Sequence, residues 1–149
     1  MLTNNAAYSR IIIEEHDLDD IRTKLQNELR EYNRPFLGQY ERSNFAAYIK
    51  DDNQNIIAAM CGFIIMPHKT ARLEHVWVSE KYRGQGIGSV MLDRVEQYAI
   101  SKSCDVIQAA TGEWHAPHFY QKRGYKEIAR VPKWFCGKDE IYFCKELKV

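Results

Sequence analysis

Long apolar runs and targeting features are missing from this sequence. No apolar stretch approaches the ~20 residues that a membrane-spanning helix needs, and the amino-terminal segment MLTNNAAYSR has neither the basic patch nor the apolar run of a secretory signal. We therefore expect a cytoplasmic protein without a membrane partner.

The sequence also lacks metal-binding patterns and an excess of either charge. Its four cysteines form no CxxC pair and have no histidine at zinc-finger spacing, so no metal site is predicted. They are interpreted as free thiols of the core in a reducing compartment, and they are Cys61, Cys104, Cys136 and Cys144. The 21 basic and 20 acidic residues give a net charge of +1, which argues against a nucleic-acid partner and favours small ligands.

The composition is that of an ordinary globular protein. Apolar residues make up 45% of the 149 positions and charged residues 28%. A chain of this size can bury a single core. No repeat, low-complexity tract or linker divides it, so residues 1–149 are predicted to form one domain.

The amino-terminal third predicts a strand, a helix and a hairpin. The β-branched run Ile11–Ile13 predicts a first strand, and Asp17 is interpreted as the N-cap of a helix that ends near Asn33. Pro35 and Gly38 predict a loop after that helix. The turn-forming residues at 51–55 separate two apolar runs, which predict an antiparallel hairpin of Phe45–Ile49 and Ile56–Met66.

The rest of the chain predicts alternating strands and helices. The expected elements are a strand Arg72–Val78, a turn Ser79–Tyr82, an amphipathic helix from Ile87, a buried strand Val106–Ala110, a short helix opened by Pro117 and stopped at Gly124, and strands Tyr125–Val131 and Glu140–Leu147. The fold class is therefore α/β. We expect a mixed, mostly antiparallel sheet of about seven strands with three or four helices packed on both faces.

A glycine-rich turn is the strongest local signal. The run Arg83-Gly84-Gln85-Gly86-Ile87-Gly88-Ser89 follows a predicted strand and opens a helix, where free N–H groups and the helix dipole attract anions. It is not a P-loop, because no lysine stands between Gly88 and Ser89, and its glycine spacing differs from the dinucleotide fingerprint. Taken alone, the run is equally compatible with a turn that binds nothing.

A second motif further along the chain decides between these alternatives. Arg83 to Gly88 fits the Gln/Arg-x-x-Gly-x-Gly/Ala motif of the GNAT superfamily of acetyl-CoA-dependent N-acetyltransferases, and the preceding residues 76–82 resemble the family's strand and turn. The run Ala116-Pro117-His118-Phe119-Tyr120-Gln121-Lys122-Arg123-Gly124-Tyr125 is similar to the family's helix ending in Tyr-x-Lys-x-Gly-Phe/Tyr. The sequence therefore resembles a small, single-domain GNAT member, most strongly from Val76 to Tyr125.

The resemblance implies where acetyl-CoA binds as co-substrate. The pyrophosphate would lie on the amides of Arg83, Gly84, Gln85, Gly86, Ile87, Gly88 and Ser89. The pantetheine arm would pair with the backbone of Val76, Trp77 and Val78 where two strands separate, much as an added strand pairs with a sheet edge. Lys122 of the second motif is also assigned to this site.

The resemblance also implies direct transfer of the acetyl group to an amine. Tyr120 matches the family tyrosine that protonates the departing sulfur, and a phenol is protonated at neutral pH. Glu74 shares strand parity with Val76 and Val78, so it is the candidate base, while a backbone N–H near Trp77 or Val78 would stabilise the oxyanion. His115 and His118 are interpreted as polar residues of a helix start, with His118 lining the acceptor pocket as an alternative.

The acceptor site is expected where the first helix and its loop meet the turn between the last two strands. Its candidates are the aromatic residues Tyr32, Phe36, Tyr40, Trp134 and Phe135. The acceptor is expected to be a small-molecule or peptide amine. Because dimers are common in the family, the resemblance is also compatible with a homodimer. Two alternatives stay open: a catalytically degenerate module that senses acyl-CoA, and a general binder of nucleotide phosphates.

Overall fold

The amino-terminal unit consists of two helices. The computed structural model describes residues 4–148, whose contacts divide them into a unit ending at Gln39 and a unit beginning at Tyr40. The first unit contains α1 (Asn4–Tyr8) and α2 (Asp19–Leu37). The strand predicted over Ile11–Ile13 is wrong, because this segment has no ladder partner in its own unit and lies in neither helix nor strand.

Helix α2 has different ends from those predicted. Asp17 has a left-handed backbone (φ 54°), and the N-cap is Leu18, which makes no side-chain capping bond. The helix passes through Pro35 instead of ending near Asn33, although Pro35 has no N–H to donate to the carbonyl four residues before it. Gly38 ends it: its N–H donates to the Arg34 carbonyl at 2.8 Å, and its φ is 70°.

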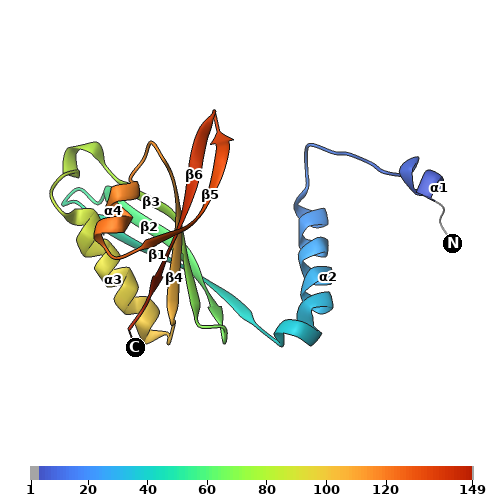
Figure 1. Cartoon of the computed structure of the whole chain (residues 1–149), viewed down its shortest axis with the longest axis horizontal. Coiled ribbons are helices and arrows are strands. Elements are labelled where there is room, and N and C mark those ends of the chain that lie inside the picture. The colour runs from blue at the N-terminus through green and yellow to red at the C-terminus, as the bar shows by residue number, and fades with distance from the viewer. Residues whose placement is uncertain (1–3, 149) are drawn as a thin grey trace. The chain divides into compact units, whose positions relative to one another are not determined.

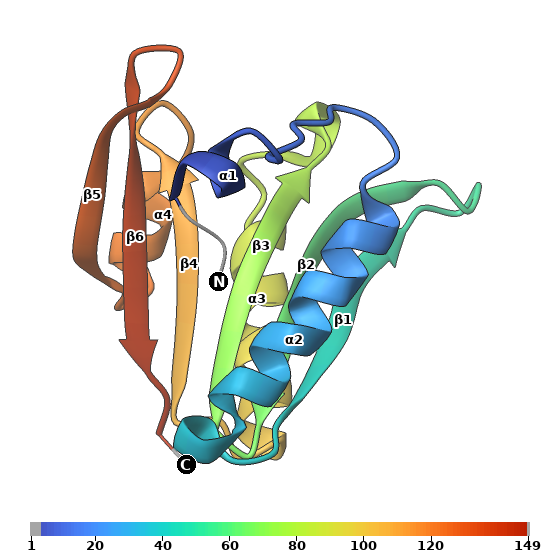
Figure 2. The same cartoon turned by 90° about the vertical axis from the view of Figure 1, so that its right-hand side faces the viewer.

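The second unit is built on one mixed sheet. Its described residues form six strands in the order β1-β2-β3-β4-β6-β5, in which only the β3–β4 pair is parallel (Figure 2). The count is six instead of about seven, because Ile11–Ile13 is not a strand. The strands are β1 (Glu41–Lys50), β2 (Ile56–Met66), β3 (Thr70–Val78), β4 (Val106–Gly112), β5 (Lys126–Phe135) and β6 (Lys138–Glu146).

Two helices cover one face of this sheet. The 15-residue α3 (Ile87–Ser101) and the short α4 (Pro117–Lys122) lie on the same side (Figure 1), and a 3₁₀ turn, Glu80–Tyr82, precedes α3. Their apolar stripes and the inward side chains of the strands make the core, with the largest fully buried members Phe143, Met60, Ile64, Leu92, Ile107, Val95 and Cys104. The α/β class is confirmed. Helices on the opposite face and a single domain over residues 1–149 stay predictions.

The parallel pair at the centre of the sheet separates part of the way along. Strand β3 pairs with β4 only from Thr70 to Leu73, opposite Val106 to Ala109. Both strands continue beyond these residues, and in Figure 2 they diverge toward the top of the sheet. Beyond these residues the two strands do not pair with each other across the gap, as the sequence resemblance led us to expect.

Two features are absent from residues 4–148. No group of three or more His, Cys, Asp or Glu side chains among them is arranged to hold a metal ion. None of their helices is long and apolar enough to cross a membrane.

All four cysteines are free, and burial raises the pKa of Cys104. Cys136 is exposed in the β5–β6 hairpin, so its assignment to the core is wrong.

Candidate active site

A β-bulge in β3 sets which side chains face the gap. Cys61 of β2 pairs with His75, but the next residue pairs with Leu73, so Glu74 is the extra residue of the bulge. Leu73 before the bulge and Val76 and Val78 after it all pack on the core. The parity argument that placed Glu74 on the face of Val76 and Val78 is therefore wrong.

Glu74 instead takes part in an ion pair on the sheet. The Arg42 guanidinium donates to Glu74 Oε1 at 3.1 Å, and both side chains are partly exposed. The Arg42 guanidinium also stacks on the Phe63 ring, with 3.7 Å from its central carbon to the ring centroid. The carboxylate still lines a cavity of about 410 Å³ that extends between β3 and β4.

The backbone of β3 directs polar groups into the gap. The Ser79 N–H donates to the Ile57 carbonyl at 2.8 Å, and antiparallel ladders alternate bonded and non-bonded residues. Trp77 therefore belongs to the β2 ladder, whereas Val76 and Val78 turn their N–H and C=O groups toward the gap. The Val78 carbonyl accepts a hydrogen bond of 2.8 Å from Arg83 Nε. Of the two predicted oxyanion donors, only the Val78 N–H faces the gap.

The glycine-rich turn opens α3 directly beside this gap. Gly84 and Gly86 have left-handed backbones (φ 73° and 81°), and Gly86 is the N-cap of α3. A Cβ on either glycine would meet no atom within 4 Å, so the turn is open to a ligand. The first N–H groups of α3 lack partners inside the helix, which makes this end an anion site.

A continuous cleft connects the glycine-rich turn with Glu74. Its larger part, of about 540 Å³, is lined by the turn and the end of β3. Five residues line both this part and the cavity beside Glu74: Val76, Trp77, Trp114, His115 and Tyr120. Two ligands, one entering along α3 and the other entering past Glu74, would thus meet beside Tyr120.

Tyr120 lies in an aromatic setting at this junction. It is the one buried residue of α4, and its ring packs against Phe119, Tyr125 and Phe143 with centroid distances of 5.2, 5.4 and 5.5 Å. Burial raises the pKa of Tyr120 to about 12. Its hydroxyl is therefore protonated throughout the neutral range, and Tyr120 lines both parts of the cleft.

A buried polar network holds the ring beside Tyr120. The Tyr125 hydroxyl donates to Glu96 Oε1 at 3.1 Å, and Lys145 Nζ donates to Glu96 Oε2 at 2.8 Å. Burial, reinforced by the negative charge of Glu96, raises the pKa of Tyr125. Glu96 comes from α3, Tyr125 precedes β5 and Lys145 lies in β6, so this network ties together three elements around the junction.

Glu96→Leu is expected to lower the free energy of unfolding by about 3 kcal/mol, because it leaves the Lys145 ammonium and the Tyr125 hydroxyl without their shared acceptor. Urea unfolding followed by circular dichroism measures the change. Gln97→Leu, on an exposed position of the same helix, is the matched control. Equal stabilities of the two variants would contradict a structural role for the network.

The structure brings most of the predicted cofactor residues to one cleft. Those that line it are Val76, Trp77, Val78, Arg83, Gly84, Gly86, Ile87, Gly88 and Ser89. Gln85 does not line it, since its Nε2 donates to the Lys81 carbonyl at 3.1 Å, and exposed Lys122 does not line it either. What these residues bind stays a prediction.

The predicted acceptor residues fall into three places. Tyr32 and Phe36 pack on each other in α2, at 6.2 Å between centroids, and their part in the acceptor site stays a prediction. Tyr40 lies beside His68, at 5.9 Å. Trp134 and Phe135 line a smaller cavity at the tip of the β5–β6 hairpin.

Sequence reasoning missed Trp114 and underrated His115. Both belong to the loop between β4 and α4, and both line the two parts of the cleft. The available signal was their place directly after a strand at a point where the sheet separates, which is where α/β proteins bind ligands. His118 lies elsewhere: its Nδ1 is 3.2 Å from Gln121 Oε1, and it lines neither part.

The fold and the cleft together define a GNAT-type α/β protein. The model of the Acetyltransferase (GNAT) family matches residues 11–125, and this chain belongs to that family. Its structure is similar to that of an acetyltransferase from Bacillus cereus, with a TM-score of 0.81 and 24% identity over 94% of this chain and 99% of that one. A GNAT family acetyltransferase from Elizabethkingia anophelis, solved with acetyl-CoA bound, has a TM-score of 0.62 and 22% identity over 79% and 83% of the two chains.

Curated relatives with named activities match the chain in part. Thialysine N-epsilon-acetyltransferase from Bos taurus is 32% identical over 77 residues, which are 50% of this chain and 45% of the relative. Blasticidin-S acetyltransferase from Streptomyces morookaense is 28% identical over 104 residues, 69% of this chain and 75% of the relative. The chain thus spans about half the length of the first of these proteins.

Proposed function

We propose that this protein is an N-acetyltransferase that moves the acetyl group of acetyl-CoA directly to a primary amine. The observation that carries the proposal is the position of Tyr120, a buried and protonated phenol where the cleft along the glycine-rich turn meets the cavity beside Glu74. Transfer between two bound substrates requires a proton donor at such a meeting point.

The chain's own residues fit acetyl-CoA in shape and charge. The N–H groups of Ile87, Gly88 and Ser89 at the start of α3 would hold the pyrophosphate, and the open space at Gly84 and Gly86 admits it. The pantetheine amides would pair with the backbone groups of Val76 that face the gap, because the Val78 carbonyl already accepts a hydrogen bond from Arg83 Nε. Acetyl-CoA supplies an acetyl group activated as a thioester.

Each proton that moves in the reaction has a donor and an acceptor. The nitrogen of a neutral amine forms the new C–N bond, and the Val78 N–H would donate to the acetyl oxygen as negative charge develops there. The C–S bond breaks, its electron pair stays on sulfur, and the Tyr120 hydroxyl gives that sulfur a proton. Glu74 would take the proton that the amine loses, directly or through water.

A catalytically degenerate module that binds acyl-CoA is the second candidate. The observation that favours it is the Arg42–Glu74 ion pair, which engages the carboxylate needed as base. Such a module would bind acetyl-CoA and release no acetylated product with any amine.

Initial rates with acetyl-CoA and a panel of small and peptide amines test the proposal. Intersecting double-reciprocal lines are expected, together with an unchanged protein mass after incubation with acetyl-CoA alone. The mass matters because Cys61, which is partly buried, lines the cavity beside Glu74. Parallel lines with a mass gain of one acetyl group would replace direct transfer by a covalent route, and no turnover with any amine would favour the degenerate module.

A further inference from the structure

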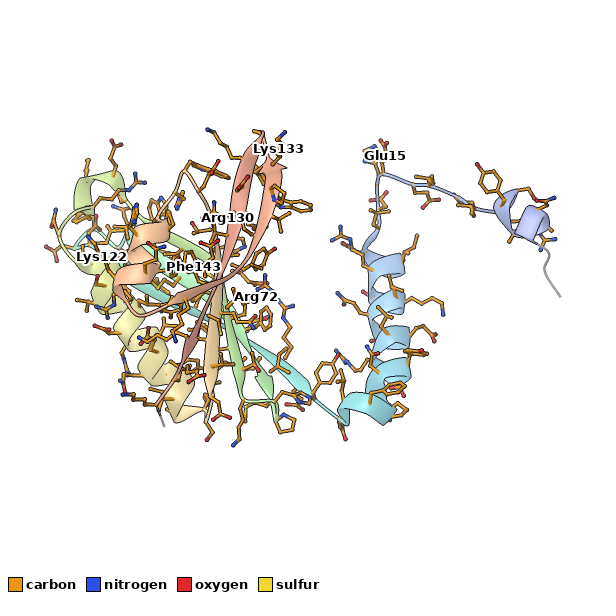
Figure 3. All side chains as sticks on the ribbon, viewed as in Figure 1. Glu15, Arg72, Lys122, Arg130, Lys133 and Phe143 are labelled. Carbon is orange, nitrogen blue, oxygen red and sulfur yellow. The ribbon has the colours of Figure 1, made fainter. Side chains whose placement is uncertain are left out.

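A third cavity, outside the proposed chemistry, is walled by aromatic rings. Its volume is about 170 Å³, and it lies between the β4–α4 loop and the β5–β6 hairpin, whose outer end carries Lys133 (Figure 3). Trp114, Trp134 and Phe135 line it, and the Trp114 and Phe135 rings are 6.1 Å apart between centroids. We call the open space lined by these three exposed rings and Glu140 the aromatic box.

Trp114 joins the aromatic box to the reaction site. It lines the box, the cavity beside Glu74 and the cleft along the glycine-rich turn. Its ring lies so close to Gly112 that a Cβ there would be 2.4 Å from two of its ring carbons. The His115 N–H donates to the Gly112 carbonyl at 2.9 Å, so a tight turn presents this ring, and glycine at 112 is needed for its position.

The box contains a carboxylate without a cationic partner among residues 40–148. Glu140 is partly buried, and its Oε2 accepts a hydrogen bond of 3.0 Å from the Tyr142 hydroxyl. In that part of the chain no Lys, Arg or His nitrogen lies within 4.0 Å of it. The Arg72 guanidinium lies over the Tyr142 ring, with its central carbon 5.8 Å from the ring centroid.

The neighbouring carboxylates are in a different situation. Arg130 lies 4.0 Å from Glu113, 3.0 Å from Glu127 and 3.5 Å from Asp139, so these three acids share one guanidinium. Glu140 alone of this group faces the ring-lined cavity. Aromatic faces and a carboxylate attract the same ligand, an organic cation, because the faces carry negative potential.

We propose that the aromatic box binds the far, positively charged end of the acceptor, so that the physiological acceptor is an amine carrying a second alkylammonium group. The proposal rests on the proposed function and narrows its substrate class. The reacting amine would lie in the cavity beside Glu74 and Tyr120, and the second cation between Trp114 and Trp134, next to Glu140. The two segments predicted to form the acceptor site, residues 32–40 and 132–138, contain no acidic residue, and the carboxylate comes instead from strand β6.

Binding is tested first, without turnover. The chain has three tryptophans, so its indole N–H groups give three NMR signals, which Trp→Phe variants assign. Choline is expected to shift the signals of Trp114 and Trp134, whereas its neutral isostere 3,3-dimethylbutan-1-ol is expected to bind at least about tenfold more weakly. The proposal would be overturned if the two probes bound equally. It would also be overturned if neither tryptophan signal shifted because another part of the chain or a second copy fills the box.

Variants of single acids sharpen this test. Glu140→Gln is expected to weaken choline binding about tenfold. Glu113→Gln, which removes an acid of the same region that does not line the box, is the matched control and is expected to leave it unchanged. Trp134→Leu, at an exposed position, provides a second variant that folds if Glu140→Gln does not. Loss of binding in the control alone would contradict the assignment.

Turnover separates this proposal from the proposed function. With 1,5-diaminopentane, kcat/KM is expected to exceed that with pentylamine at least tenfold, and Gly112→Ala, which displaces Trp114, is expected to reduce the difference through KM. Equal turnover of both amines without choline binding would overturn the aromatic box and leave acetyl transfer standing. Choline binding with no acetylation of any amine would support the box and overturn acetyl transfer.

Discussion

Tyr120→Phe is expected to lower kcat by about 10²–10³ while the Kd for acetyl-CoA stays nearly unchanged. The variant keeps the ring that packs on Phe119, Tyr125 and Phe143, and it removes only the hydroxyl that would protonate the departing sulfur. Single-turnover rates and calorimetric titration measure the two quantities separately. A variant that turns over as fast as the wild type would remove Tyr120 from the chemistry.

A matched control and the pH profile make this result specific. Tyr82→Phe alters a tyrosine that lines the cleft away from the junction, and it is expected to leave kcat within about twofold, since it removes no reacting group. Because burial raises the pKa of Tyr120 to about 12, its ionisation should cause no fall in kcat up to about pH 10. A basic limb near pH 8 that disappears in Tyr120→Phe would contradict this environment.

Gly86→Glu is expected to weaken acetyl-CoA binding at least about a hundredfold, or about 2.8 kcal/mol. Two effects act together at this position. The substitution strains a backbone with φ of 81°, and it places a negative side chain at the helix end where the pyrophosphate would lie. Calorimetric titration with acetyl-CoA measures the loss.

Gly137→Glu is the matched control for this variant. Gly137 has a similar backbone (φ 78°), and a Cβ there would also meet nothing within 4 Å, but it lies in the β5–β6 hairpin. Any loss of stability from the left-handed backbone should therefore be similar, without loss of acetyl-CoA affinity. If both variants lost affinity equally, the effect would reflect folding and not the phosphate site.

Local signals predicted the parts of the fold that depend on neighbouring residues. Strand β2 has the bounds Ile56–Met66 that its apolar run predicted, and Pro117 opens α4 as its fixed φ led us to expect. The glycine-rich turn was identified for the same reason. Its conformation depends on residues that are adjacent in the sequence, so a short motif specifies it.

The errors concern features that depend on distant pairing. The bulge at Glu74 arises from the register between β2 and β3, which no period along one strand reveals. Ile11–Ile13 has β-branched residues but no ladder partner in its unit. The aromatic box is assembled from a loop and a hairpin that are separated in the sequence. Glu140 was predicted only as a strand residue, because the sequence does not show that β6 lies beside the β4–α4 loop.

The most direct test of the account is calorimetric titration of the wild-type protein with acetyl-CoA, at moderate salt so that nonspecific phosphate attraction is screened. One site with a micromolar Kd is expected, with ATP competing only weakly because it has no pantetheine arm to pair with β3. Absence of binding, or ATP binding as tightly as acetyl-CoA, would contradict the proposed role of the cleft beside Tyr120.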